Sequence, residues 1–133
     1  MSRPVLVSLV LAAAVALAGC AGANTSARNF KGTERDVADA IADFQSAGQR
    51  KDRTKICTEL LTVELARSLR APGTSCEDEI DDALADADDY DLNIKAVNVT
   101  GASATAQVEN ADRTFTMRLQ RIGAAWRISS LGS

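Results

Sequence analysis

In its first half the chain places apolar residues at the three- and four-residue spacing of an α-helix. After Thr33, a candidate N-cap, this spacing predicts a helix with inward positions at Val37, Ile41 and Phe44. The segments RTKICTEL and TVELARSLR follow as two further helical pieces, with a break at 61–62. After APG, the stretch TSCEDEIDDALADADD predicts a last helix that a capping box opens, Thr74 with Glu77 or Ser75 with Asp78.

From residue 92 onward the apolar positions alternate, which predicts half-buried strands. Turns between the alternating segments predict a meander of about four antiparallel strands. One face is apolar and the other polar, so helices are expected to cover a single side. The fold class is therefore predicted to be α+β. The inward positions are expected to be Val97, Val99, Ala104, Ala106, Val108, Phe115, Met117, Leu119, Trp126 and Ile128.

Two local features predict the register of the sheet. The apolar positions before residue 95 have the opposite parity from those after residue 96, which predicts a bulge near Lys95 or Ala96. A two-residue turn at Gly123-Ala124 would pair Leu119 with Ile128.

The N-terminal residues have the pattern of an export signal. Arg3 precedes an apolar run over residues 5–17 that is broken by one serine. As a helix this run would reach about 20 Å, well short of a hydrocarbon core of about 30 Å. A charged start, a short apolar centre and small residues at its end are typical of a secretory signal peptide rather than a membrane span.

The stretch Leu17-Ala18-Gly19-Cys20 resembles the lipobox of bacterial lipoproteins. In those proteins the cysteine thiol receives a diacylglyceryl group, and cleavage leaves that cysteine as the first residue. The resemblance implies that residues 1–19 are a lipoprotein signal peptide and that Cys20 anchors the protein on the outer side of a bacterial cytoplasmic membrane. An ordinary signal peptide with an incidental cysteine is the alternative. Residues 20–32, small and polar, are predicted to be a flexible tether, and residues 33–133 the folded domain.

Three cysteines in an exported chain leave one unpaired thiol. If Cys20 is lipidated, Cys57 and Cys76 form an even pair in an oxidising compartment, and a disulfide between two helical faces is expected. Two free core cysteines are the alternative. A catalytic thiol is disfavoured, because the chain has no histidine to activate it.

Charge and composition exclude several functions. The absence of histidine excludes a Ser-His-Asp hydrolase and a histidine-ligated metal site. Loss of Arg3 with the signal takes the net charge from −3 to −4, and with few aromatic residues this makes nucleic-acid binding unexpected. No cofactor is predicted.

The acidic run from Glu77 to Asp91 suggests calcium but fails the EF-hand pattern, since Val97 stands where the bidentate glutamate belongs. No metal is predicted there, although a weak surface cation site stays open. A solvated helix face is the ordinary interpretation. An acid/base group is the other interpretation, built from Asp86, Asp88, Asp89 and Tyr90.

Helices followed by a sheet that closes with Gly123-Ala124-Ala125-Trp126-Arg127-Ile128 resemble the NTF2-like superfamily. Further short motifs are similar to small actinobacterial-type lipoproteins of that fold: Ile56-Cys57, Ser75-Cys76-Glu77 and Val97-Asn98-Val99-Thr100-Gly101. The resemblance implies a cone in which a curved sheet wraps around the helices and leaves a pocket at its open end. Enzymes of the superfamily place Asp, His or Tyr on the inward face. No such residue stands on an inward strand position here, so no catalytic residue is carried over.

These observations lead to a functional prediction. Small inward residues, Ala104 and Ala106, either admit a helix closely or leave a pocket bounded by Phe44, Phe115, Met117 and Trp126. On the outer sheet face, Arg118 and Arg127 either meet an acidic protein partner or serve solubility. We expect a non-catalytic module that binds a small apolar ligand or an envelope protein. A cyclase- or isomerase-like enzyme and a structural accessory subunit of an envelope complex are the alternatives.

Overall fold

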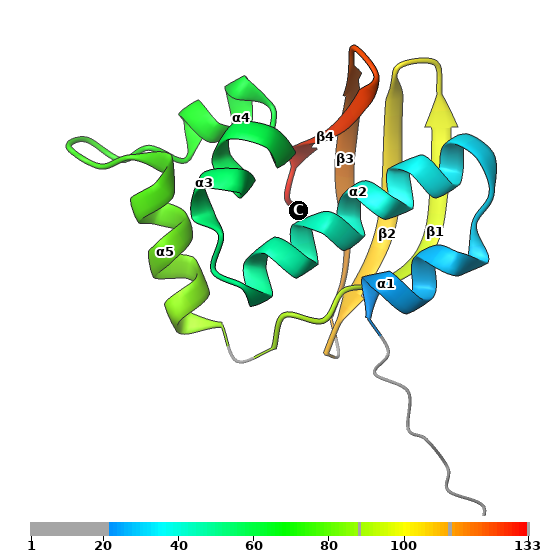
Figure 1. Ribbon diagram of the computed structural model, residues 1–133, viewed down its shortest axis with the longest axis horizontal. Helices are drawn as coiled ribbons and strands as arrows, with labels where there is room; N and C mark the ends of the chain where they lie inside the picture. Colours follow the sequence, from blue (N-terminus) through cyan, green and yellow to red (C-terminus); the bar gives the residue numbers. More distant parts are fainter. Residues whose placement is uncertain (1–21, 88, 112, 133) are drawn as a thin grey trace, which may run out of the picture.

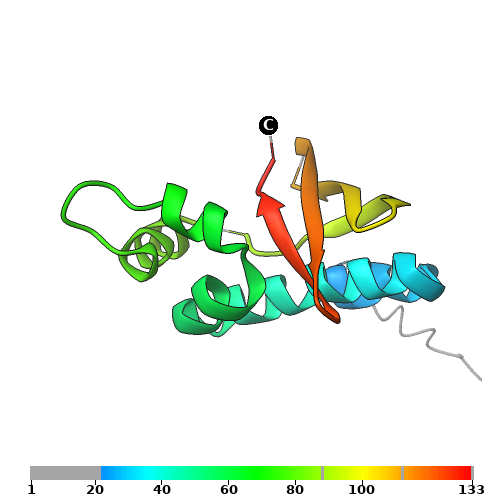
Figure 2. The ribbon, with the colours of Figure 1, turned by 90° about the horizontal axis from the view of Figure 1, so that it is seen from above.

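A computed structural model describes residues 22–87, 89–111 and 113–132 and has helices on one side of an antiparallel sheet (Figures 1 and 2). The predicted α+β class is therefore confirmed. The elements in chain order are α1 (Ala23–Ser26), the 3-10 turn η1 (Ala27–Asn29), α2 (Gly32–Gln49), α3 (Arg53–Lys55), the π-helical turn η2 (Ile56–Leu60), α4 (Val63–Ser68), α5 (Cys76–Asp86), β1 (Asn93–Thr100), β2 (Ser103–Asn110), β3 (Arg113–Ile122) and β4 (Ala125–Ser130).

The sheet has the order β1-β2-β3-β4, with every neighbouring pair antiparallel. Leu119 pairs with Ile128 as predicted, and the β1 register shifts between Ile94 and Ala96, which confirms the bulge. Gly123 opens the last turn with a φ of 64°, a backbone conformation that favours glycine. The alternating residues of β2, β3 and β4 are buried on the helical side, so the predicted inward face is correct.

The last predicted helix start is confirmed and the first is wrong. At α5, the Asp78 backbone N–H donates to the Ser75 hydroxyl and the Ser75 N–H donates to the Asp78 carboxylate, each at 3.2 Å, which completes a capping box. Helix α2 begins at Gly32, so Thr33 already lies in the first turn and cannot cap it. Lys31 occupies the N-cap position, without a side-chain hydrogen bond.

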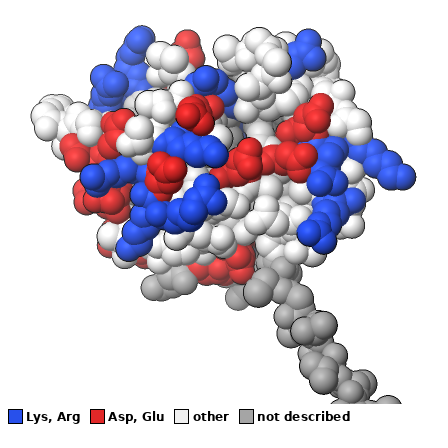
Figure 3. Space-filling model, viewed as in Figure 1, with Lys and Arg blue, Asp and Glu red and all other residues white. Residues whose placement is uncertain are grey.

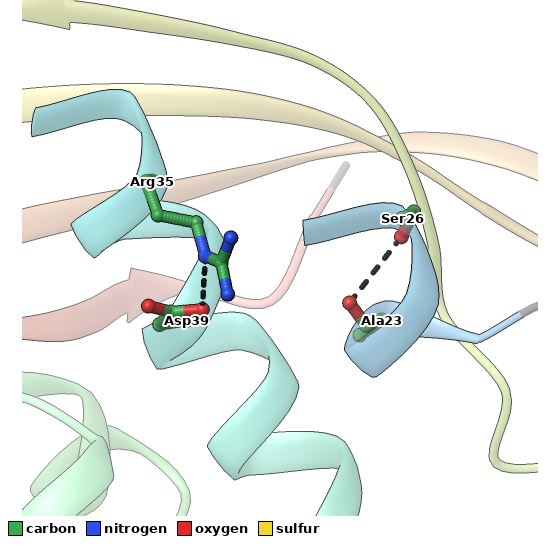
Figure 4. Close-up of polar contacts among 4 residues, drawn as sticks. All are labelled: Ala23, Ser26, Arg35 and Asp39. Atoms are coloured by element: carbon green, nitrogen blue, oxygen red, sulfur yellow. Dashed lines mark hydrogen bonds and ion pairs between the residues drawn. The ribbon is translucent and has the colours of Figure 1, made fainter. Parts of the chain in front are cut away.

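The short helix α1 packs tightly on α2 and β1. Ala23 and Ala27 are buried, and the Ala23 backbone N–H donates to Oε1 of Gln45 at 2.9 Å. The hydroxyl of Ser26 faces the carbonyl of Ala23 (Figure 4) and accepts a hydrogen bond from the Ile94 backbone N–H at 3.0 Å. Alanine and serine side chains are small enough to allow this close approach of backbones.

The flexible tether predicted for residues 20–32 is therefore wrong over Gly22–Asn29, because these residues are folded against the rest of the domain. Among the described residues, the folded part therefore includes residues 22–29, ahead of the predicted boundary at residue 33. The predicted signal peptide and Cys20 lie outside the described residues. Within the described ranges, every helix is too short or too polar to span a bilayer.

The free side of β4 is occupied by the break between the two central helical pieces. Leu61 forms a parallel bridge with Ile128, and the backbone N–H of Thr62 donates to the Ile128 carbonyl at 2.8 Å. The predicted break at 61–62 is thus a short extended segment that forms one β-bridge with the sheet. It also carries α4 across the edge of β4.

Candidate functional site

A cavity of about 260 Å³ lies between α2, α5, the C-terminal end of β2 and the N-terminal end of β3. Helix α2 contributes Phe44 and Gly48, and α5 contributes Ile80, Ala83 and Leu84. The remaining apolar wall is formed by Ile56, Leu92, Phe115 and Leu131. The residues that line the cavity are therefore mostly apolar, which is the usual character of a site for a small ligand.

Gly48 is one reason why the cavity is open. It lies on the same face of α2 as Phe44, one helical turn later. A β-carbon at this position would stand 3.5 Å from Cδ2 of Leu84 and 3.9 Å from Cδ1 of Tyr90. A larger side chain would fill the space between the two helices, and glycine leaves it empty at a cost of about 1 kcal/mol in helix propensity.

Gln45 is a buried polar residue in the cavity wall that the sequence pattern did not single out. Its side chain is 4 % exposed, and Oε1 accepts hydrogen bonds from the backbone N–H groups of Ala23, at 2.9 Å, and of Leu92, at 2.6 Å. Among the described residues, Gln45 is the hydrogen-bond partner of both donors. One amide oxygen therefore holds the start of α1 and the segment after α5 to α2.

The other polar side chains of the cavity are also engaged in hydrogen bonds. The Tyr90 hydroxyl donates to the Leu84 carbonyl. Nδ2 of Asn110 donates to the carbonyls of Asp89 and Asp91, at 3.2 and 2.7 Å. The exposed Asp89 carboxylate accepts from the Asp91 N–H at 2.9 Å. These bonds fix the segment 89–92 against the sheet, so the polar groups shape the cavity and close one side of it.

The structure does not assemble the acid/base group considered for the acidic run. Asp86 and Asp89 are exposed, and Asp88 lies outside the described residues. The buried polar residues in the described part of the chain are Ser26, Gln45 and Thr62, none of which is a carboxylic acid. In the same part, no group of three or more acidic or cysteine side chains is placed to hold a metal ion.

Two of the four predicted pocket residues line the cavity and two do not. Phe44 and Phe115 contribute to its wall. Met117 and Trp126 are 1 % and 7 % exposed and belong to the packed core outside it. Ala106 pairs with Met117 across the sheet and is fully buried, so the small strand residues admit helix packing there. The cavity lies instead where β2 ends and β3 begins, on the side of the domain that carries α5.

The predicted disulfide is present between Cys57 and Cys76, with their Cα atoms 6.1 Å apart. It joins η2 to the first residue of α5. An ion pair between Arg53 and Asp81, at 2.9 Å, supports the same helix from outside. The wall of the cavity that α5 forms therefore depends on this crosslink.

The two arginines predicted to form a partner face have different surroundings. Nη1 of Arg127 donates to the carbonyls of Thr58 and Leu61, at 2.9 and 3.4 Å, so this side chain ties η2 to β4. Arg118 is exposed and stays a candidate for contact with an acidic partner. On the helical face in Figure 3, acidic and basic side chains are interspersed and no large area of one sign is seen.

No protein-family model matches this chain, and no curated protein or solved structure matches it. Its class is therefore defined by its own architecture. The chain is an α+β domain with helices on a four-stranded antiparallel sheet and an apolar cavity at one end.

Proposed function

We propose that this protein is an extracytoplasmic lipoprotein, anchored through Cys20, whose domain binds a small apolar ligand without catalysing a reaction. The observation that carries the proposal is the cavity of about 260 Å³ and its apolar lining. Burial of hydrocarbon yields about 25 cal/mol per Å² of apolar surface, so such a space favours an apolar occupant over water.

The state of the polar side chains supports binding over catalysis. A general acid or base needs a free proton-transfer group within reach of the substrate. Here the Tyr90 hydroxyl and the Gln45 amide oxygen are occupied by backbone partners, and the nearest carboxylate, Asp89, is exposed. An enzyme of the cyclase or isomerase type would need an additional group in this cavity.

The anchor and the fold family are parts of the same proposal. The lipobox-like LAGC at 17–20 and the disulfide, which suits an oxidising compartment, both support an extracytoplasmic position. Helices on one side of an antiparallel sheet, with a cavity at one end, are compatible with an NTF2-like cone. We infer that the chain is a divergent member of that superfamily.

Occlusion of the cavity tests the function. Ala83 lines the cavity from an exposed position of α5, while Ala85 is exposed on the same helix and does not line it. N-phenyl-1-naphthylamine, an uncharged apolar fluorophore, is titrated into the purified protein. We expect saturable binding to wild type and to Ala85→Phe, and loss of binding in Ala83→Phe. Equal binding by the two variants, or none by wild type, would contradict the proposal.

A further inference from the structure

The point where the chain enters the domain touches the cavity wall. Gly22 is buried, and a β-carbon there would stand 2.9 Å from Nε2 of Gln45 and 3.4 Å from Oδ1 of Asp91. The next residue, Ala23, donates its backbone N–H to Gln45, which lines the cavity. Only the side chain of Gln45 therefore lies between Gly22 and the cavity.

The opening of the cavity lies on the segment that also reaches this entry point. Among its lining residues, Ala83 and Asp89 are exposed, so the mouth lies between the end of α5 and the segment that follows it. Asp89 is two residues from Asp91, which faces Gly22. Figure 1 shows that the segment after α5 runs along the lower side of the domain, past the adjacent ends of β2 and β3, to the start of α1.

The distance between this end and the proposed anchor is short. Gly22 follows Cys20 by two positions, a span of at most about 7 Å, whereas a tether over 20–32 could have reached roughly 40 Å. A lipid on Cys20 would therefore keep the point where the chain enters the domain, and the cavity wall beside it, close to the membrane surface. Because α1 is folded against α2, the part of the chain that could act as a long tether is shorter than the sequence predicted.

We propose that the ligand is a hydrocarbon chain of a membrane phospholipid, which enters the cavity directly from the bilayer beside the anchor. This inference rests on the proposed function and adds the source of the ligand. Every methylene that crosses water adds to the barrier of transfer, so a mouth held at the lipid surface shortens the exposed path. The apolar walls contributed by Phe44, Leu84 and Phe115 are suited to a chain without polar groups.

Photolabelling in vesicles tests this source. The lipidated protein is reconstituted into phosphatidylcholine vesicles that contain a phosphatidylcholine with a diazirine near the end of one acyl chain. We expect label on the peptides that contain Ala83, Tyr90 or Phe115, with loss of this label in Ala83→Phe and retention in Ala85→Phe. A second arm adds a free diazirine fatty acid to the protein in unlabelled vesicles.

The Cys20→Ala protein, added to the same vesicles from solution, separates the two proposals. We expect it to lose the phospholipid label and to keep the fatty-acid label. Equal phospholipid labelling with and without the anchor would overturn delivery from the adjacent bilayer. Fatty-acid labelling without phospholipid labelling of the anchored protein would overturn the inference and leave the proposed function standing. Absence of cavity label in both arms would overturn both.

Discussion

Helices α2 and α5 form opposite walls of the cavity but are held in place in different ways. Helix α2 has 18 residues and buries seven of them against the sheet and α1. Helix α5 has 11 residues and buries Cys76 and Ile80, and it stands at the side of the molecule away from the sheet (Figure 1). Six of its residues are acidic and cannot be buried without partners. One wall thus belongs to the hydrophobic core along most of its length, whereas the other contributes two buried residues to that core and is also attached to it by a covalent bond.

Replacement of Ile41 on α2 by alanine is expected to have the largest effect, and Ile80 on α5 provides the comparison. Ile41 is fully buried on α2, and Ile41→Ala should lower the free energy of unfolding by about 4 kcal/mol. Ile80→Ala should cost about 2 kcal/mol, because Ile80 already borders a cavity. Urea unfolding of both variants measures these losses. A larger loss for Ile80→Ala than for Ile41→Ala would contradict the weaker packing of α5.

Removal of the disulfide is expected to have the next largest effect. The bond closes a loop with a sequence separation of 19, and the double variant Cys57→Ala/Cys76→Ala should lose about 3 kcal/mol of stability. Hydrogen exchange followed by mass spectrometry should show that the variant exchanges faster than wild type, and that this increase is larger in α5 than in α2. A uniform increase over both helices would contradict the separate attachment of α5.

The smallest expected effect is a pH dependence at the start of α5. Hydrogen bonds from the Ser75 side chain and then its backbone hold the pKa of Asp78 below its ordinary value of 3.8, with a further contribution from Arg53. A carboxyl with a depressed pKa stabilises the fold above its unfolded pKa, and this contribution is lost as the pH falls through the folded value. The melting temperature should therefore decrease when the pH is lowered below about 4.

Ser75→Ala is the matched variant for this pH effect. It removes the hydroxyl that lowers the Asp78 pKa, so its melting temperature should change less with pH in the acid range. The same variant should lose about 1 kcal/mol at neutral pH, because the helix loses its N-cap. If the melting temperature of Ser75→Ala changes with acid pH as much as that of wild type, other carboxylates account for the pH dependence.

The strands were predictable because their burial follows a local period. Alternation in Ala104, Ala106 and Val108 shows which face is inward, and glycine marks the turn that sets the register. Helix α1 was not predictable, because its small residues show no apolar period. Ala23 and Ala27 are buried through contacts with elements far away in the sequence, which no local pattern records.

The candidate site was predictable to a smaller extent. Phe44 and Phe115 were found because large apolar residues on inward faces are natural wall candidates. Gln45 and Asn110 were missed, since a polar residue next to an apolar face usually points to solvent. Their roles depend on hydrogen bonds across 47 and 19 residues of sequence, to Leu92 and Asp91. The disulfide was found because cysteine pairing can be counted from composition.

The bridge between Leu61 and Ile128 bears on how closely copies of this domain can crowd together. Exposed strand edges recruit strands from neighbouring molecules and so lead to aggregation. In this protein the β4 edge is occupied by the chain itself, and the β1 edge is interrupted by a bulge and by the Ser26 hydroxyl bound to Ile94. Crowded copies would thus be kept from joining edge to edge.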